Sequence, residues 1–160
     1  MKLFPSKTFT IELAEDKEVS LEKLKQRTKK SNSLISSYTD KTFIGKVETN
    51  NFKLISSEIG KGALCVFTGN VKNNEIQVTT TVNTPFKVLI SIWAIGFFSF
   101  ILFMGAKENF ESLIPQLIPF LVFLLVIRYL FIGLFFKKLT NNGIKRFKDI
   151  LNIKSLTIID

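Results

Sequence analysis

The side chains that most often carry enzyme chemistry are scarce in this sequence. Its 160 residues include no histidine and a single cysteine, Cys65. Without histidine, Ser-His-Asp and Cys-His catalysis, histidine acid–base work and histidine metal sites are all excluded. A single cysteine can form neither a disulfide within the chain nor a thiolate zinc site, which suits a reducing compartment. We expect Cys65, within ALCVF, to be a small buried hydrophobe.

Two other motifs resemble functional sites but have simpler explanations. The tripeptide Gly60-Lys61-Gly62 lacks the spacing and the following Ser or Thr of a phosphate-binding loop, so it predicts a turn. Five acidic residues lie where a predicted strand ends and a helix begins, which is a common position for solvated carboxylates: Glu12, Glu15, Asp16, Glu18 and Glu22. We therefore expect no catalytic residue, no metal ligand and no cofactor, and a protein that is not an enzyme.

Two long apolar segments dominate the second half of the chain. Residues 88–106 contain no charge, and a helix of that length spans roughly 28 Å, close to the roughly 30 Å of a bilayer core. A second segment, 113–136, is interrupted only by Arg128. These segments predict a transmembrane helical hairpin over 86–136, with a short outside loop near 106–113. The charged first 20 residues predict no signal peptide.

The distribution of cations predicts the orientation of this hairpin. Thirteen Lys and Arg residues precede Lys87, which abuts the first segment, whereas the connecting loop offers Lys107 beside two glutamates. The positive-inside rule therefore places both termini in the cytoplasm. Lys87, Lys137 and Lys138 are the predicted lipid-facing cations. This topology accounts for most of the net charge of +9, and with no nucleic-acid-binding motif we expect no nucleic-acid partner.

Arg128 is the one charge inside the second apolar segment. A central arginine costs about 2.5–3.5 kcal/mol, but ending the helix before it would leave YLFIGLFF in water, so a span to Phe136 is favoured. The guanidinium is either an anchor that snorkels to the cytoplasmic surface or an intramembrane polar site. Counting from the helix ends places Arg128 opposite Gly96, within reach of Trp93 (a cation–π contact) or Ser91.

Short segments with a period of two predict a β-rich cytosolic module over residues 1–84. A strand over 8–13 precedes a helix over Lys17–Lys30, which Asp16 caps. Four further strands, 42–49, 52–56, 63–72 and 75–82, are separated by Asn50-Asn51, by the Gly60 turn and by Asn73-Asn74. We expect these four strands to form an antiparallel meander.

The segment after the hairpin, 137–160, predicts a helix with Ile144, Phe147 and Leu151 on one side, then a strand over 154–160. We expect it to pack on the N-terminal sheet, so that the hairpin is an insertion. Alternatively, the basic helix lies on the membrane surface. The expected fold is an α+β membrane protein, an antiparallel meander sheet with two amphipathic helices, interrupted by a transmembrane helical hairpin.

The pattern Phe43-x-Gly45-Lys46-Val47, then Phe52-Lys53-Leu54, then further strands and two spans, resembles small uncharacterised bacterial membrane proteins. Those proteins pair a β-rich cytosolic module with a two-helix anchor. The resemblance covers roughly residues 40–150. It implies this architecture and a place in the bacterial inner membrane, and it assigns no functional residue.

Three functions remain open. The first is a membrane-tethered interaction or adaptor module with a protein partner of unknown identity. The second is an immunity-type or regulatory protein that neutralises a toxin or effector at the inner membrane. The third is recognition of anionic lipid by Lys46, Lys53, Lys61 and Lys72. The bilayer is a partner in each, and a second copy is a further candidate because Gly96, Ser99 and Gly105 permit close helix approach.

Overall fold

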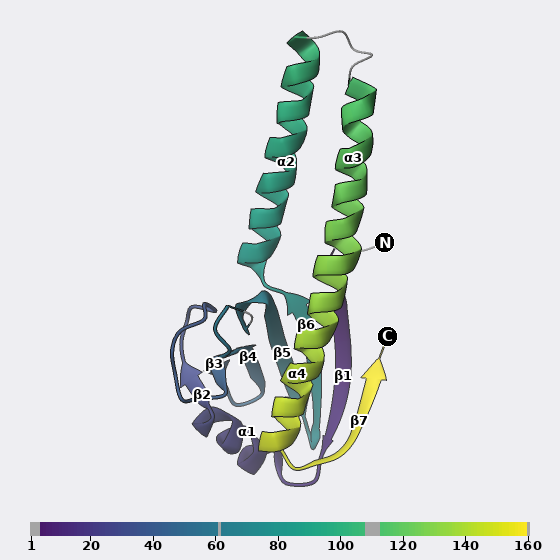
Figure 1. Cartoon of the computed structure of the whole chain (residues 1–160). Coiled ribbons are helices and arrows are strands. Elements are labelled where there is room, and N and C mark those ends of the chain that lie inside the picture. The colour runs from purple at the N-terminus through teal and green to yellow at the C-terminus, as the bar shows by residue number, and fades with distance from the viewer. Residues whose placement is uncertain (1–3, 61, 108–112, 160) are drawn as a thin grey trace.

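The computed structural model describes residues 4–60, 62–107 and 113–159, and it shows an α+β fold in which long apolar helices project from one end of a sheet (Figure 1). The strands are β1 (Ser6–Leu13), β2 (Thr28–Lys30), β3 (Phe43–Val47), β4 (Asn51–Ser56), β5 (Cys65–Lys72), β6 (Glu75–Val82) and β7 (Ile153–Ile159). The helices are α1 (Lys17–Gln26), the 3₁₀ turn η1 (Gly62–Leu64), α2 (Thr84–Lys107), α3 (Leu113–Val126), the π-helical η3 (Ile127–Leu134) and α4 (Phe135–Ile150).

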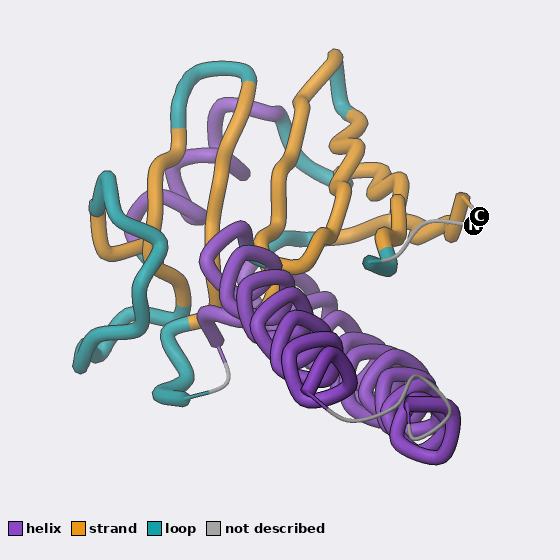
Figure 2. Tube along the Cα trace, turned by 90° about the horizontal axis from the view of Figure 1, so that it is seen from above, coloured by secondary structure: helices purple, strands orange, loops and turns teal. Residues whose placement is uncertain are grey.

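The seven strands form one mostly antiparallel sheet in the order β2-β3-β4-β5-β6-β1-β7. Strands β3 to β6 pair with their neighbours along the chain, β1 pairs with β6, and β7 pairs with β1, all antiparallel. The chain leaves the sheet after β6, makes the α2–α3 hairpin and returns through α4 to β7. The two ends of the chain thus build neighbouring strands, with the hairpin inserted between them (Figure 2).

The β2 strand corrects one predicted boundary. The helix expected over Lys17–Lys30 ends at Gln26, because Thr28, Lys29 and Lys30 pair in parallel with β3. The Thr28 hydroxyl donates a hydrogen bond to the Leu24 carbonyl oxygen (2.7 Å), which closes the last turn of α1. Lys29 and Lys30 are therefore part of an edge strand, where lysine discourages further pairing.

An aromatic cluster joins α4 to the inner face of the sheet. The ring of Phe147 is fully buried and stacks on Phe43, with ring centroids 4.6 Å apart. It also contacts Phe52 (5.6 Å) and Phe67 (5.5 Å), which come from two further strands. Gly143, one turn earlier on α4, lies over the Phe67 ring in a position that leaves no space for a Cβ. This small residue lets the helix approach the sheet closely.

The second apolar segment joins the core of the sheet earlier along the chain than the sequence predicts. The span was expected to continue to Phe136, but Phe136 (2% exposed) and Ile132 (9%) belong to the sheet core. Both residues lie on the helical stretch that runs from α3 through η3 into α4. The protein itself buries Ile132 and Phe136, which lowers the cost of ending the span earlier, whereas Tyr129, Leu134 and Phe135 stay 46–59% exposed.

Aromatic contacts set the register of the hairpin. Trp93 on α2 lies against Phe123 on α3 (5.4 Å between ring centroids), and Phe97 stacks on Phe120 (5.0 Å). Arg128 is five residues beyond Phe123, and five residues before Trp93 is Val88, so the two lie at about the same level. The predicted level, opposite Gly96, is wrong because counting from the helix ends assumed that the second span ended at residue 136.

Candidate functional site: the junction of hairpin and sheet

Asn83 fastens the base of the hairpin to the sheet. Its side chain, 5% exposed, donates hydrogen bonds to the carbonyl oxygens of Leu34 (3.0 Å) and Ala63 (2.8 Å). Its backbone N–H donates to the Leu64 carbonyl oxygen, and its own carbonyl accepts from the first turn of α2, including Lys87 N–H. One buried amide therefore ties β6, η1, the segment before β3 and the start of α2 together.

Beside this junction lies an apolar cavity of about 510 Å³. Its walls come from the turn before β5, from α2 and from the α3–η3–α4 stretch. The lining residues are Gly60, Leu64, Ile90, Phe123, Ile127, Ile132, Phe135 and Leu139. None of these described lining residues carries a polar side chain, so they supply neither an acid–base group nor a ligand for a metal ion.

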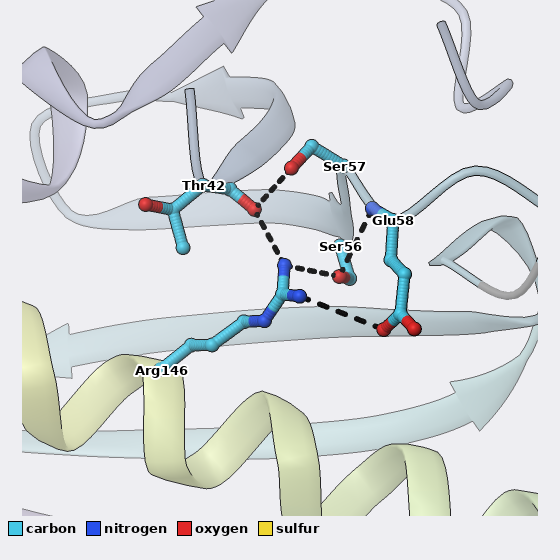
Figure 3. A network of polar contacts seen from close by, with 5 residues as sticks. All are labelled: Thr42, Ser56, Ser57, Glu58 and Arg146. Carbon is cyan, nitrogen blue, oxygen red and sulfur yellow. Dashed lines mark hydrogen bonds and ion pairs between the residues drawn. The ribbon is translucent and has the colours of Figure 1, made fainter. Parts of the chain in front are cut away.

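Arg146 holds the turn that forms one wall of this cavity (Figure 3). From α4, one guanidinium nitrogen donates to the Ser56 hydroxyl (2.7 Å) and to the Thr42 carbonyl oxygen (3.3 Å). The other terminal nitrogen lies 3.5 Å from a Glu58 carboxylate oxygen. Glu58 is two residues before Gly60, so the network fixes the direction in which the chain enters the cavity wall. In the sequence, Arg146 is 90 residues from Ser56 and 104 residues from Thr42.

We expect Arg146→Gln to lower the free energy of unfolding by about 1–2 kcal/mol, because it removes two hydrogen bonds and a partly exposed ion pair. Lys145→Gln is the matched control, since Lys145 is the exposed neighbour on α4 and should change stability by less than about 0.5 kcal/mol. Thermal unfolding of both variants in the same mild detergent checks this. Equal melting temperatures would contradict the stabilising role of the network.

The predicted intramembrane residues are distributed along the hairpin. The Arg128 guanidinium carbon lies 5.8 Å from the ring centroid of its neighbour Tyr129. Trp93 stacks on Phe97 and contacts Phe123, and Ser91 is half-buried on α2. The contact of Arg128 with Trp93 or Ser91 stays a prediction, and the observed register places the arginine about one turn below Trp93.

The predicted lipid-facing cations lie close to the junction. Lys87, on the first turn of α2, has its ammonium nitrogen 5.9 Å from the ring centroid of Phe4. Lys137 and Lys138 are exposed on the first turn of α4. These three cations lie where the hairpin meets the folded module.

Three of the four lysines proposed for lipid recognition are described, and these three do not form one group. Lys46 and Lys53 are opposite each other on β3 and β4. Lys72 pairs with Glu75 at the end of the β5–β6 ladder that is farthest from the hairpin, since Val82 at the other end leads into α2. Lys61 lies outside the described residues. The sheet therefore does not bring Lys46, Lys53 and Lys72 together at the base of the hairpin.

The remaining reactive side chains have structural roles. Cys65 is buried, and burial raises the pKa of its thiol to about 12, against a smaller lowering by the Thr140 hydroxyl. The Lys154 ammonium and the Ser155 hydroxyl donate to Glu12, which lowers the pKa of that carboxyl and joins β1 to β7. Among the described residues, no group of three His, Cys, Asp or Glu side chains could hold a metal ion.

Sequence reasoning missed Asn83 and the role of Arg146. The dipeptide Thr84-Pro85 after Asn83 is a helix-start signal, since proline suits the first turn, and it could have drawn attention to the preceding asparagine. Nothing local marks Arg146, because its partners are far away in the sequence.

Comparison with known proteins adds no relative: the chain matches no family model, no curated protein and no solved structure. The resemblance to small two-span membrane proteins therefore stays a prediction, and function must be argued from the chain's own geometry.

Proposed function

We propose that this protein is a membrane-tethered, non-enzymatic interaction module. Its hairpin crosses the bacterial inner membrane, both termini lie in the cytoplasm, and the sheet presents an open edge to a protein partner. The observation that carries the proposal is the solvent-facing apolar surface of a hairpin that leads directly into a well-packed sheet.

The hairpin surface is the first support. Two helical stretches, Thr84–Phe103 and Leu117–Ile150, each contain an 18-residue apolar window, with mean hydropathies of 2.2 and 2.5, and only 6% of each window is buried within the chain. Side chains such as Leu89, Ile92 and Ile95 are 63–67% exposed. Leaving such surface in water costs roughly 25 cal/mol per Å², a cost that a bilayer removes.

The positions of the cations are the second support. Lys87 and Lys107 are separated by 20 residues of α2, or about 30 Å, which matches the hydrocarbon thickness. Because Arg128 is level with Val88, it lies beside Lys87 at the cytoplasmic boundary. An arginine there requires only a short reach to lipid phosphates, which favours the anchoring role over an intramembrane polar site.

The open edge of the sheet is the candidate partner surface. Within the part of the chain that the structure describes, β7 pairs only with β1, so its outer backbone groups are available for another strand. Two adjacent side chains near its end, Ile158 and Ile159, are 56% and 47% exposed. A seven-residue edge with exposed isoleucines is suited to strand addition, in which main-chain hydrogen bonds give affinity and side-chain contacts give specificity.

Membrane orientation indicates that the strand added to β7 comes from a different protein and not from a second copy of this chain. Because β7 is antiparallel to β1 and β1 to β6, β7 runs in the same direction as β6, toward the hairpin (Figure 1). In two copies with the same membrane orientation, both β7 strands run toward the bilayer. Antiparallel pairing of the two edges would require one copy to be inverted.

The test combines topology with a variant of the edge. We expect a tag after residue 160 to be unreachable from outside intact cells. Cross-linking in native membranes should recover a stoichiometric partner, and Ile158→Lys should reduce its recovery by about tenfold, because a charge on an edge opposes strand addition. Val19→Lys, at a 49% exposed position on α1, is the matched control. A tag that is accessible from outside would overturn the proposed topology. Equal partner recovery with both variants would overturn the assignment of β7 as the partner surface.

A further inference from the structure

The apolar cavity at the junction has features of a ligand site. Its volume of about 510 Å³ falls within the roughly 300–1,000 Å³ that is usual for small-molecule pockets. Its walls come from three separate parts of the chain, and the hydrogen bonds of Asn83 and Arg146 hold the start of α2 and the turn before β5 in place. We propose that this cavity binds one acyl chain of an anionic phospholipid. This inference depends on the membrane placement argued above, but not on the β7 partner.

The lining specifies an apolar occupant. Leu139 and Ile132 are buried at its inner wall, whereas Phe123 and Phe135 are 45% and 46% exposed around it. The register puts Phe123 level with Trp93, above Arg128, and Ile132 belongs to the sheet core below it. The cavity therefore extends across the level where the hydrocarbon region meets the cytoplasmic surface, and an acyl chain can enter from the bilayer without crossing water.

Cations that neighbour lining residues in the sequence favour an anionic head group. Three cations adjoin lining residues in the sequence: Lys87 is one turn before Ile90, Arg128 follows Ile127, and Lys138 precedes Leu139. The acid next to the cavity wall, Glu58, is paired with Arg146, which reduces its repulsion of a phosphate. A phosphate held by lysine or arginine at this level forms charge-assisted hydrogen bonds while its acyl chain fills the apolar space.

The other occupant to consider is a second copy of the chain. The cavity lies between the two helical legs of one hairpin and a turn of the same chain, and it is open on the side where Phe123 and Phe135 are half exposed. Gly96, by contrast, is a position where an added Cβ would meet nothing within 4 Å. A helix of another copy has an open approach at Gly96, whereas a flexible acyl chain is better suited to the cavity.

The test uses the full chain, purified in mild detergent and incubated with an equimolar mixture of phosphatidylglycerol and phosphatidylcholine. Native mass spectrometry then counts the phospholipids retained by each chain. We expect one retained phosphatidylglycerol per wild-type chain. Ile90→Trp, which fills the cavity, should reduce retention by about tenfold. Ile92→Trp, at a 64% exposed position two residues away on α2, should retain as much lipid as wild type.

Two further variants separate loss of lipid binding from loss of folding and test the head-group preference. If Ile90→Trp lowers the melting temperature, Ile127→Trp fills the same cavity from the opposite helix. The double variant Lys87→Gln with Lys138→Gln should retain lipid but lose its preference for phosphatidylglycerol. Equal retention by the cavity-filling variants and by Ile92→Trp would overturn the proposal, since the lipid would then be a non-specific shell. Wild-type retention without a head-group preference would overturn the anionic assignment, and a dimer that excludes lipid would assign the cavity to a second copy.

Discussion

Replacing Phe147 with alanine is expected to release α4 from the sheet and to lower the free energy of unfolding by about 3–5 kcal/mol, the usual cost of emptying a buried phenylalanine site. Phe147 is fully buried, and its ring contacts Phe43, Phe52 and Phe67 from three strands. These side chains are themselves closely packed, so the cavity left by the ring cannot collapse easily. Edge-to-face and stacked geometry adds about 0.5–1.5 kcal/mol per pair to the loss.

Denaturant unfolding in a mild detergent, followed by far-UV circular dichroism, measures this effect. Phe147→Leu should cost less, about 1–2 kcal/mol, because most of the buried volume is kept. Phe98→Ala is the matched control for losing an aromatic ring, since Phe98 is 45% exposed on α2 and its ring stacks on Phe120 of α3. An equal effect of the Phe98 and Phe147 variants would contradict the assignment of Phe147 to the core.

The second large effect is expected at Gly45, where alanine should lower the free energy of unfolding by about 3 kcal/mol or more. Gly45 has a φ of +146°, and a Cβ built on it would overlap the carbonyl oxygen of Lys53 on the paired strand. The overlap involves backbone, so no side-chain rotation relieves it, and β3 must move away from β4. The loss should appear in the same unfolding measurement, together with exchange of the β3 amide protons.

Gly60→Ala separates the two causes of this loss. Gly60 also has a positive φ, +77°, but an added Cβ would meet nothing within 4 Å. Alanine there has only the conformational cost of about 1–2 kcal/mol. If Gly45→Ala costs no more than Gly60→Ala, the close approach of β3 and β4 does not constrain position 45.

Local sequence was sufficient for several elements because their causes are local. The turn at Asn73-Asn74 was predicted from asparagine's tolerance of positive φ, and Asn73 has a φ of 53°. The alternating residues of β5 and β6 predicted those strands within two residues of their observed ends. Cys65 is buried, as its apolar neighbours indicated. The two long apolar helices follow from hydrophobicity over some twenty residues, which is also a local property.

Contacts between distant residues decided the rest. The pairing of β1 with β6 and β7, and of β2 with β3, joins segments that carry no mark of their partner. Arg146 reaches Ser56 across 90 residues, and the apolar residues Ile132 and Phe136 look like membrane span until the sheet is present to bury them. Hydrophobicity predicts that a side chain avoids water, but it does not predict whether lipid or protein replaces the water. Only the tertiary structure makes that choice, because the sheet surface that competes with the bilayer is assembled from strands on both sides of the hairpin.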